Sequence, residues 1–364
     1  MEGKLHSVGF RDQLSAAYPW TTAPLIVSAP MRVMSGPDLA VAVSRAGGLG
    51  FIGPGENPEQ TAIDLEAAKA LLAASGIHGA RQPEAGAGTV LPVGVGFLIW
   101  NGDLDVSAST VSQYRPAAVW LYAPRNGQSD VDSWTKRLRG ASPESMIWLQ
   151  IGTLKEALEA VRSASPPDVI VVQGAEAGGH GRTADAIGFI TLIPEISDAI
   201  RGSGIPLIAA GGISDGRGVA AALGVGAAGA VMGTRFLASQ EARIKKAYQA
   251  EVVRASDGGV NTVRTHLYNH LRGTFGWPQQ FTPRTIVNRS WVEHQAGTAF
   301  EEIKKHHDEA VRKGDAAWGP EGWTATYAGA SVGLVRSVEG AGAIVEGARS
   351  EAVEIIRGLS GFLG

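Results

Sequence analysis

The sequence predicts an α/β protein, a (β/α)8 TIM barrel with a small C-terminal helical cap domain, and three observations support this prediction. Eight short apolar runs occur before residue 235, and helical segments separate most of them. These runs are continuously apolar, as expected for parallel strands that helices cover on both faces. The chain of 364 residues is long enough for one large barrel. An open doubly wound sheet is the alternative.

The predicted strands and helices alternate along the chain. Gly47 and Gly48 end the first helix, since glycine commonly terminates a helix. The second helix carries Leu65, Ala68 and Leu72 on one face. The eight predicted strands lie at residues 25–30, 49–53, 91–99, 117–122, 146–151, 169–173, 206–210 and 230–232. The predicted helices between them include 37–46, 59–74, 153–164 and 216–223.

The regular alternation ends near residue 255. Residues 255–326 are rich in Trp, His and Pro, show no clear strands and contain a predicted helix at 298–313. We interpret 255–326 as a cap or substrate subdomain over the barrel mouth. Residues 1–254 and 327–364 then form the barrel, which a last helix at 341–359 completes. A Gly- and Ala-rich segment at 76–88 is expected to be a mobile surface stretch.

Composition excludes several classes of function. The net charge of −3 gives no electrostatic basis for binding nucleic acid or a membrane surface. No stretch of about 18 uninterrupted apolar residues is present, so we expect no membrane span. The absence of cysteine excludes disulfides, thiolate metal sites and cysteine nucleophiles. Residues 1–10 are charged and do not resemble a secretory signal, so we expect a cytoplasmic protein.

Two glycine loops give the strongest functional signal. The seventh predicted strand ends in Ala210-Gly211-Gly212-Ile213, and the eighth leads into Gly233-Thr234. In TIM barrels, the loops after strands seven and eight commonly bind a phosphate group. Glycine lets the backbone N–H groups approach an anion closely, and the Thr234 hydroxyl adds a donor. The two loops together therefore predict a phosphate site, although each by itself would pass for an ordinary turn.

A second signal follows the sixth predicted strand. The run from Gln173 to Gly181 contains Gly179 and His180, which would lie at the C-terminal face of the barrel. Histidine is the side chain best suited to accept a proton near neutral pH. We predict that His180 is catalytic; the alternative is a loop histidine bonded to backbone. Met31, at the end of the first strand, faces either the mouth or the core.

Two further motifs are set aside. The stretch from Gly48 to Gly53 has the G-x-G-x-x-G spacing of a dinucleotide site, but a helix precedes it and Pro54 follows, so we assign these glycines to a strand. His306, His307 and Asp308 lie in a charged helix, where adjacent histidines point in different directions. We interpret them as a solvated helix face and predict no metal site.

These motifs resemble the nitronate monooxygenase family, formerly called 2-nitropropane dioxygenases. The resemblance spans about residues 20–240 in order and spacing, and the stretch 327–335 is similar to the C-terminal segment of the family. Its most specific parts are the His180 and Gly211-Gly212 motifs. The motifs that carry it are Ala29-Pro30-Met31, the run from Gln173 to His180, Ala210-Gly211-Gly212-Ile213 and Gly233-Thr234-Arg235-Phe236.

The resemblance implies a TIM barrel with FMN across its mouth. The backbone of Ala29, Pro30 and Met31 would meet the flavin ring, with Gln150 as a polar contact from the fifth strand. Gly211, Gly212, Gly233 and Thr234 would hold the phosphate, with Gly179, Ala210 and Ile213 beside them. His180 would be the active-site histidine of the family.

The implied reaction is the oxidation of an alkyl nitronate by O2 to a carbonyl product and nitrite. The nitronate is a stabilised carbanion equivalent and gives one electron to the flavin. If the substrate is a neutral nitroalkane, His180 would first remove its α-proton. The implied partners are therefore a small-molecule substrate and O2, and a homodimer is left open.

The sequence departs from bacterial members of the family at the end of the third strand. Those members carry Asn or another polar residue there, whereas this chain has Trp100 directly after the predicted strand. The bulky Trp100 and the Trp-rich cap indicate a pocket for something other than a small nitroalkane. Two enzyme alternatives stay open, an enoyl reductase-like protein that uses FMN and NAD(P)H and an oxidative tailoring enzyme for a larger metabolite. A barrel that only binds a ligand is the non-enzyme alternative.

Overall fold

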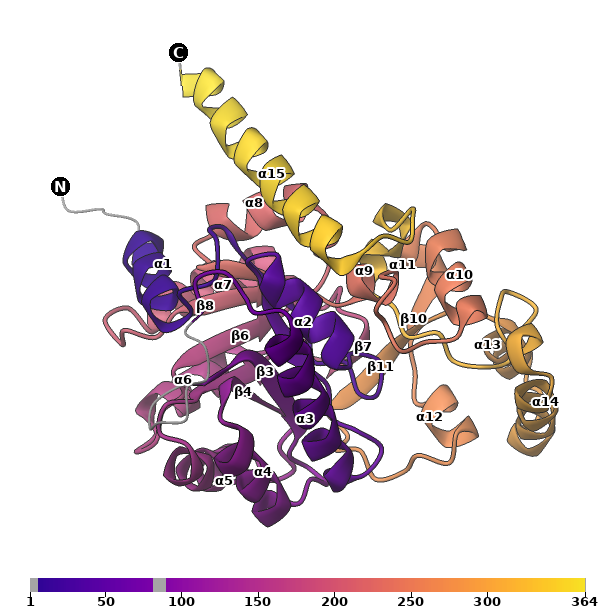
Figure 1. Ribbon diagram of the computed structural model, residues 1–364. Coiled ribbons are helices and arrows are strands. Elements are labelled where there is room, and N and C mark those ends of the chain that lie inside the picture. The colour runs from indigo at the N-terminus through magenta and orange to yellow at the C-terminus, as the bar shows by residue number, and fades with distance from the viewer. Residues whose placement is uncertain (1–5, 81–89, 364) are drawn as a thin grey trace.

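The computed structural model describes residues 6–80 and 90–363, so most of the predicted surface stretch at 76–88 lies outside the described residues. Eight parallel strands close into a barrel in chain order, which confirms the predicted TIM barrel (Figure 1). The last strand pairs with the first, with Leu25 opposite Gly229 and Ser28 opposite Met232. The barrel strands are β1 Leu25–Ser28, β2 Leu49–Ile52, β3 Leu91–Leu98, β4 Pro116–Tyr122, β5 Met146–Ile151, β6 Val169–Gln173, β8 Leu207–Ala210 and β9 Gly229–Met232.

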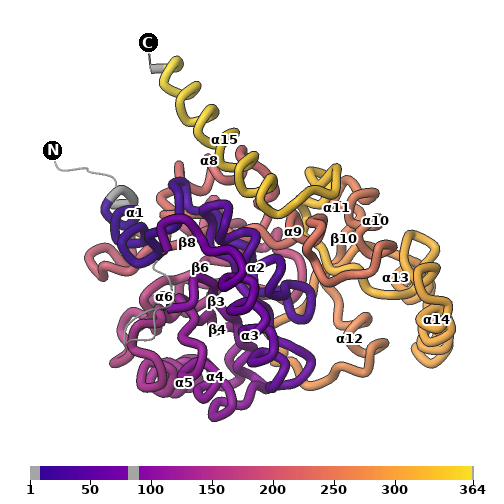
Figure 2. Tube along the Cα trace, in the orientation of Figure 1, coloured from indigo at the N-terminus to yellow at the C-terminus, as the bar shows by residue number. Residues whose placement is uncertain are grey.

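Helices surround the barrel (Figure 2). Strands such as β1 and β4 are buried along their whole length, which explains their continuously apolar sequences. The first crossover shows how tightly the layers pack, since a Cβ atom on Gly50 would lie 1.9 Å from the Ala40 carbonyl oxygen of α2. The helices of the barrel are α1 His6–Ala17, α2 Pro37–Arg45, α3 Pro58–Ala74, α4 Leu104–Tyr114, α5 Gln128–Ala141, α6 Leu154–Arg162, α7 Phe189–Ala199, α8 Gly216–Gly224, α9 Thr234–Leu237 and α10 Lys246–Arg254.

Aromatic side chains fill one part of the barrel interior. The rings of Trp120 and Trp148 stack with centroids 5.9 Å apart, and Phe51 packs edge-on against Trp120. The indole Nε1 of Trp148 donates to the Tyr18 hydroxyl at 2.8 Å, which ties the segment before β1 to the core. This part of the barrel interior is therefore a packed core.

The expectation that residues 255–326 lack strands was wrong. Strands β10 (Thr262–Arg264) and β11 (Phe281–Ile286) form a second, antiparallel sheet. Its third member, β7 (Gly179–Arg182), comes from the segment after β6 and carries His180. β11 pairs with β7, about a hundred residues earlier in the chain, and β10 joins the sheet through β11, so no local apolar run predicts this sheet.

The rest of residues 255–326 consists of helices and the segments that connect them, and its helices lie to one side of the barrel, at the right of Figure 1. It contains α11 Gly258–Asn261, α12 Leu267–Leu271, α13 Arg289–Gln295 and α14 Phe300–Arg312. Helix α15 (Ala341–Leu359) then returns to pack on α8 and α2, and its far end extends beyond the barrel body. Among the described residues, none of the helices is both long and apolar enough to span a membrane.

Candidate active site

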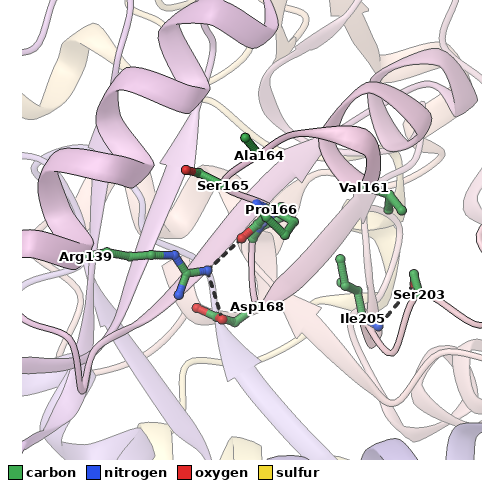
Figure 3. A pocket seen from close by; sticks show the side chains of 9 residues that line it. Arg139, Val161, Ala164, Ser165, Pro166, Asp168, Ser203 and Ile205 are labelled. Atoms are coloured by element: carbon green, nitrogen blue, oxygen red, sulfur yellow. Dashed lines mark hydrogen bonds and ion pairs between the residues drawn. The ribbon is translucent and has the colours of Figure 1, made fainter.

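One hollow of about 390 Å³ lies at the N-terminal end of the barrel, away from the predicted site (Figure 3). It is bordered by the residues just before β6 and β8. There Arg139 donates to the Pro166 carbonyl at 2.6 Å and to Asp168 at 3.0 Å, and the second Asp168 oxygen accepts from the Ile147 N–H. The carboxylate is thus already satisfied by the fold, and stability is the role this face usually has in a TIM barrel.

The opposite, C-terminal face brings the sequence-predicted residues together. Strands β8, β9 and β1 are neighbours, so the segments that follow them lie side by side. These segments carry Ala210 to Ile213, then Gly233 and Thr234, then Ala29 to Met31. The Ala29 N–H donates to the Met232 carbonyl at 3.0 Å. A Cβ on Gly233 would lie 3.7 Å from Ala29 Cβ, an ordinary van der Waals distance, so the two segments approach each other closely.

The segment after β8 requires its two glycines. Gly211 and Gly212 have φ angles of +95° and +75°, a region that other residues seldom adopt. A Cβ on Gly211 would also lie 2.9 Å from the Gly174 carbonyl oxygen. The His180-bearing segment, residues 174–180, therefore packs directly on this turn. The side chain of Ile213 points into the core, which leaves only its backbone for the site.

Thr234 and Gln150 each keep a donor after making one internal hydrogen bond. The Thr234 hydroxyl oxygen accepts from the Gly329 N–H at 2.9 Å, so its own proton is left to donate. The Gln150 carbonyl oxygen accepts from the Trp120 indole at 3.0 Å, so its NH2 group is left to donate. Both side chains stand at the C-terminal ends of barrel strands or just beyond them.

His180 lies in β7 and is restrained on three sides. Its carbonyl oxygen accepts from the Tyr122 hydroxyl at 3.0 Å and from Gln173 Nε2 at 3.2 Å. Trp277 stacks on its ring with centroids 3.5 Å apart and planes 8° from parallel. Its Nε2 is 2.9 Å from the side-chain nitrogen of Asn269. The imidazole is therefore held in one orientation.

The surroundings of His180 favour its neutral form. Burial, with further contributions from His266, Arg264 and Arg272, lowers the pKa of His180 to about 3. Each of these groups is or becomes cationic, and a positive charge nearby disfavours a second one. Neutral imidazole is the form that can hydrogen-bond or accept a proton at physiological pH.

Arg264 of β10 fixes the segment that presents His180. Its guanidinium donates to four backbone carbonyls at 2.6–3.2 Å, those of Ala175, Ala177, Gly179 and Thr282. Burial and the neighbouring Arg284 lower the pKa of Arg264 to about 10. Arg284 also donates to the Ala175 carbonyl, at 3.1 Å. Two cations from the second sheet thus lie against the His180-bearing segment.

Sequence reasoning missed Asn269, Tyr122 and Arg264, because an isolated Asn, Tyr or Arg carries no motif. It did note Trp100 and the Trp-rich cap, and the ring of Trp277 from that region packs on Trp100 with centroids 5.0 Å apart. Arg125 lies over Trp100 and donates to the Gly276 carbonyl at 3.0 Å. The end of β3 therefore supports the Trp277 ring that covers His180.

The two motifs that were set aside have structural positions. The G-x-G-x-x-G stretch is strand β2, which confirms the assignment to a strand. The interpretation of His306 to Asp308 as a solvated face was wrong for His307, which is buried and bonds to Asp308 at 3.1 Å. His306 bonds to Glu293 at 3.0 Å instead. Helix α14 packs on α12 and α13, and this packing buries one of its histidines.

Comparison with known proteins supplies the family. Residues 137–275 match the family model described as nitronate monooxygenase. The chain is 61% identical to nitronate monooxygenase npaC of Metarhizium robertsii, over 95% of this chain and 96% of the relative. The chain belongs to the nitronate monooxygenase family. It is also 33% identical to a nitronate monooxygenase of Neurospora crassa, over 96% of this chain and 94% of that one.

A solved relative supports the fold of this nitronate monooxygenase family member. The nitroalkane oxidase of Streptomyces ansochromogenes superposes with a TM-score of 0.70, covering 95% of this chain and 99% of that one at 24% identity. At this identity the likeness establishes the barrel fold. Family membership establishes in addition that the protein is an enzyme, an oxidoreductase.

Proposed function

We propose that this enzyme oxidises alkyl nitronates with O2, using FMN, and releases a carbonyl product and nitrite. The observation that carries the proposal is the direct packing of the His180-bearing segment on the glycine turn after β8. Gly329, which bonds to Thr234, also packs against Gly178. One continuous surface therefore joins the proposed catalytic residue to the proposed phosphate site. The name of the 61% identical relative adds support from outside the structure.

The residues at the barrel mouth fit FMN. Gly211 and Gly212 have positive φ angles and no side chain, so their backbone can approach an anion closely, and Gly233 lies beside Ala29 and Met31. Gly211, Gly212, Gly233 and Thr234 would hold the phosphate, and Gln150 would donate to the ring. The backbone of Ala29, Pro30 and Met31 would line the ring, with Gly179, Ala210 and Ile213 adjoining. Bound FMN would supply one-electron oxidation and reactivity with O2.

The protein's own groups suit an anionic substrate. A nitronate carries a full negative charge over its nitro group, and the guanidinium groups of Arg264 and Arg272 provide positive charge near His180. Trp277 covers one face of the imidazole and limits access of water. We propose that His180 contacts the nitro group of the substrate.

The test is O2 uptake by the FMN-loaded protein with propyl-2-nitronate and no NAD(P)H. We expect rapid uptake with nitrite release. In His180→Asn, we expect nitronate oxidation to fall, because the proposed contact between the imidazole and the nitro group is lost. A flavin-loaded protein that shows no uptake would refute the proposal. NADH oxidation with an enoyl thioester would then support the reductase alternative, and inactivity with both substrates would direct attention to a larger metabolite.

A further inference from the structure

A chain of hydrogen bonds from the cap region ends on His180. The Arg272 guanidinium donates to the Tyr327 hydroxyl at 3.1 Å. The Tyr327 hydroxyl donates to the Asn269 carbonyl oxygen at 3.3 Å. The Asn269 side-chain nitrogen then lies 2.9 Å from His180 Nε2. Four side chains from β7, α12 and the segments near residues 272 and 327 are thus joined in series.

The direction of this chain is fixed by its first member. Arginine can only donate hydrogen bonds, so Arg272 makes the Tyr327 oxygen an acceptor. The Tyr327 proton is then directed to the Asn269 oxygen, which orients the amide. The Asn269 NH2 group therefore faces His180 as a donor, and Nε2 must accept. A neutral imidazole whose Nε2 accepts carries its proton on Nδ1.

The surroundings make this arrangement hard to reverse. Asn269 is only 2% exposed, and its backbone carbonyl accepts from the Thr274 N–H at 2.8 Å. Arg272 also lies over the Tyr327 ring, 5.6 Å from its centroid. In the described part of the chain, His180 Nδ1 has no hydrogen-bond partner, and it is not among the side-chain atoms that are buried without one.

We propose that Asn269, oriented by Tyr327 and Arg272, is a positioning residue that holds neutral His180 with its proton on Nδ1. His180 then offers an N–H group to the oxygen of an anionic nitronate. Its only lone pair is occupied by Asn269, so it is not free to take a proton from a neutral nitroalkane. The inference rests on the proposed function, and it selects the charged nitronate as the substrate form.

The basic groups around His180 also favour its neutral form. His266 lies beside α12, Arg272 follows it and Arg264 comes from β10, and all three disfavour a second proton on the imidazole. A doubly protonated ring would also place an Nε2–H group against the Asn269 NH2 group, donor against donor. No carboxylate is hydrogen-bonded to the ring among the described residues.

Nitrogen-15 NMR of histidine-labelled holoenzyme tests the tautomer directly, with His180→Asn to assign the signal. Between pH 6 and 8, we expect wild-type His180 to be protonated at Nδ1 and unprotonated at Nε2. In Asn269→Asp, the new carboxylate accepts from the ring, so the proton should move to Nε2. A wild-type signal with a protonated Nε2 would overturn the proposal, as would an unchanged tautomer in Asn269→Asp.

Steady-state kinetics with propyl-2-nitronate and 2-nitropropane provides the functional readout. In Asn269→Asp, we expect nitronate kcat/KM to fall about 10- to 100-fold, the usual effect of losing a hydrogen bond to a charged group. We expect the ratio of nitroalkane to nitronate activity to rise, because Nδ1 becomes a free lone pair. Asn261→Asp adds the same charge at an exposed cap position and should leave both activities within about twofold.

The two proposals fail in distinguishable ways. If wild-type holoenzyme releases no nitrite from the nitronate, the proposed function fails while the tautomer can still be measured. If the nitronate is oxidised but Asn269→Asp changes neither the substrate ratio nor its pH profile, the positioning role of Asn269 fails. Tyr327→Phe gives a second check, since it releases the amide from its orienting donor and should yield a mixture of tautomers.

Discussion

Replacing Arg264 with Met should lower the stability of the protein and, in addition, displace His180. The methionine keeps most of the apolar stem but removes four hydrogen bonds to backbone carbonyls, three of them in the segment 175–179 just before His180. At about 1 kcal/mol for each carbonyl left without this donor, the loss is about 4 kcal/mol. A domain is commonly stable by roughly 5–15 kcal/mol, so the variant should still fold.

Arg349→Met is the matched control. Arg349 of α15 also donates to backbone carbonyls, at 3.0 Å to Ala46 and 2.7 Å to Gly47, and its Nε is likewise buried without a partner. With two bonds rather than four, its loss should cost about 2 kcal/mol. It lies on the outside of the barrel, away from the His180-bearing segment, so catalysis should be unaffected.

The assays are urea unfolding and nitronate-dependent O2 uptake. We expect both variants to unfold at lower urea than the wild type, Arg264→Met more so. Only Arg264→Met should lose activity, by about 100-fold in kcat/KM, the effect of displacing a reacting group by about 1 Å. Full activity in Arg264→Met would refute the role of Arg264 in fixing the segment that presents His180. An equal loss of activity in Arg349→Met would show that general destabilisation is the cause.

Two other perturbations test the phosphate turn and the charge state of His180. Gly212→Ala puts a side chain at φ +75° and 3.1 Å from Glu176 Cβ, so FMN should bind at least about 10-fold more weakly. The control Gly202→Ala, at φ +88° in open space, should share only the backbone strain of about 1–2 kcal/mol and should keep the FMN affinity of the wild type. Equal FMN affinities in the two variants would contradict the assignment of the phosphate turn. Because the pKa of His180 is about 3 in the folded protein and near 6.5 unfolded, unfolding takes up a proton between these values, so the free energy of unfolding should rise with pH from about 3 to 6.5. Urea titrations at pH 4.5 and 7.5 should show a smaller rise in His180→Asn, and an identical rise would contradict the lowered pKa.

The sequence by itself determined the barrel and the face of the barrel that carries the predicted residues. Parallel strands covered on both faces must be continuously apolar, so each strand is visible as a local run, and the order of the runs locates the loops after them. The glycines at 211 and 212 were visible for a similar reason, because a positive φ restricts the residue type at that position.

Only the tertiary structure decided what surrounds His180. Asn269 is 89 residues from His180 in the chain and Tyr327 is 58 residues beyond Asn269. A single polar residue that meets its partner at such separation leaves no periodic pattern in the sequence. The same holds for the second sheet, in which β11 pairs with β7 and β10 pairs with β11. The sequence therefore predicted which histidine to consider. The tautomer and charge of that histidine depend on long-range hydrogen bonds, burial and neighbouring cations, and these exist only in the folded chain.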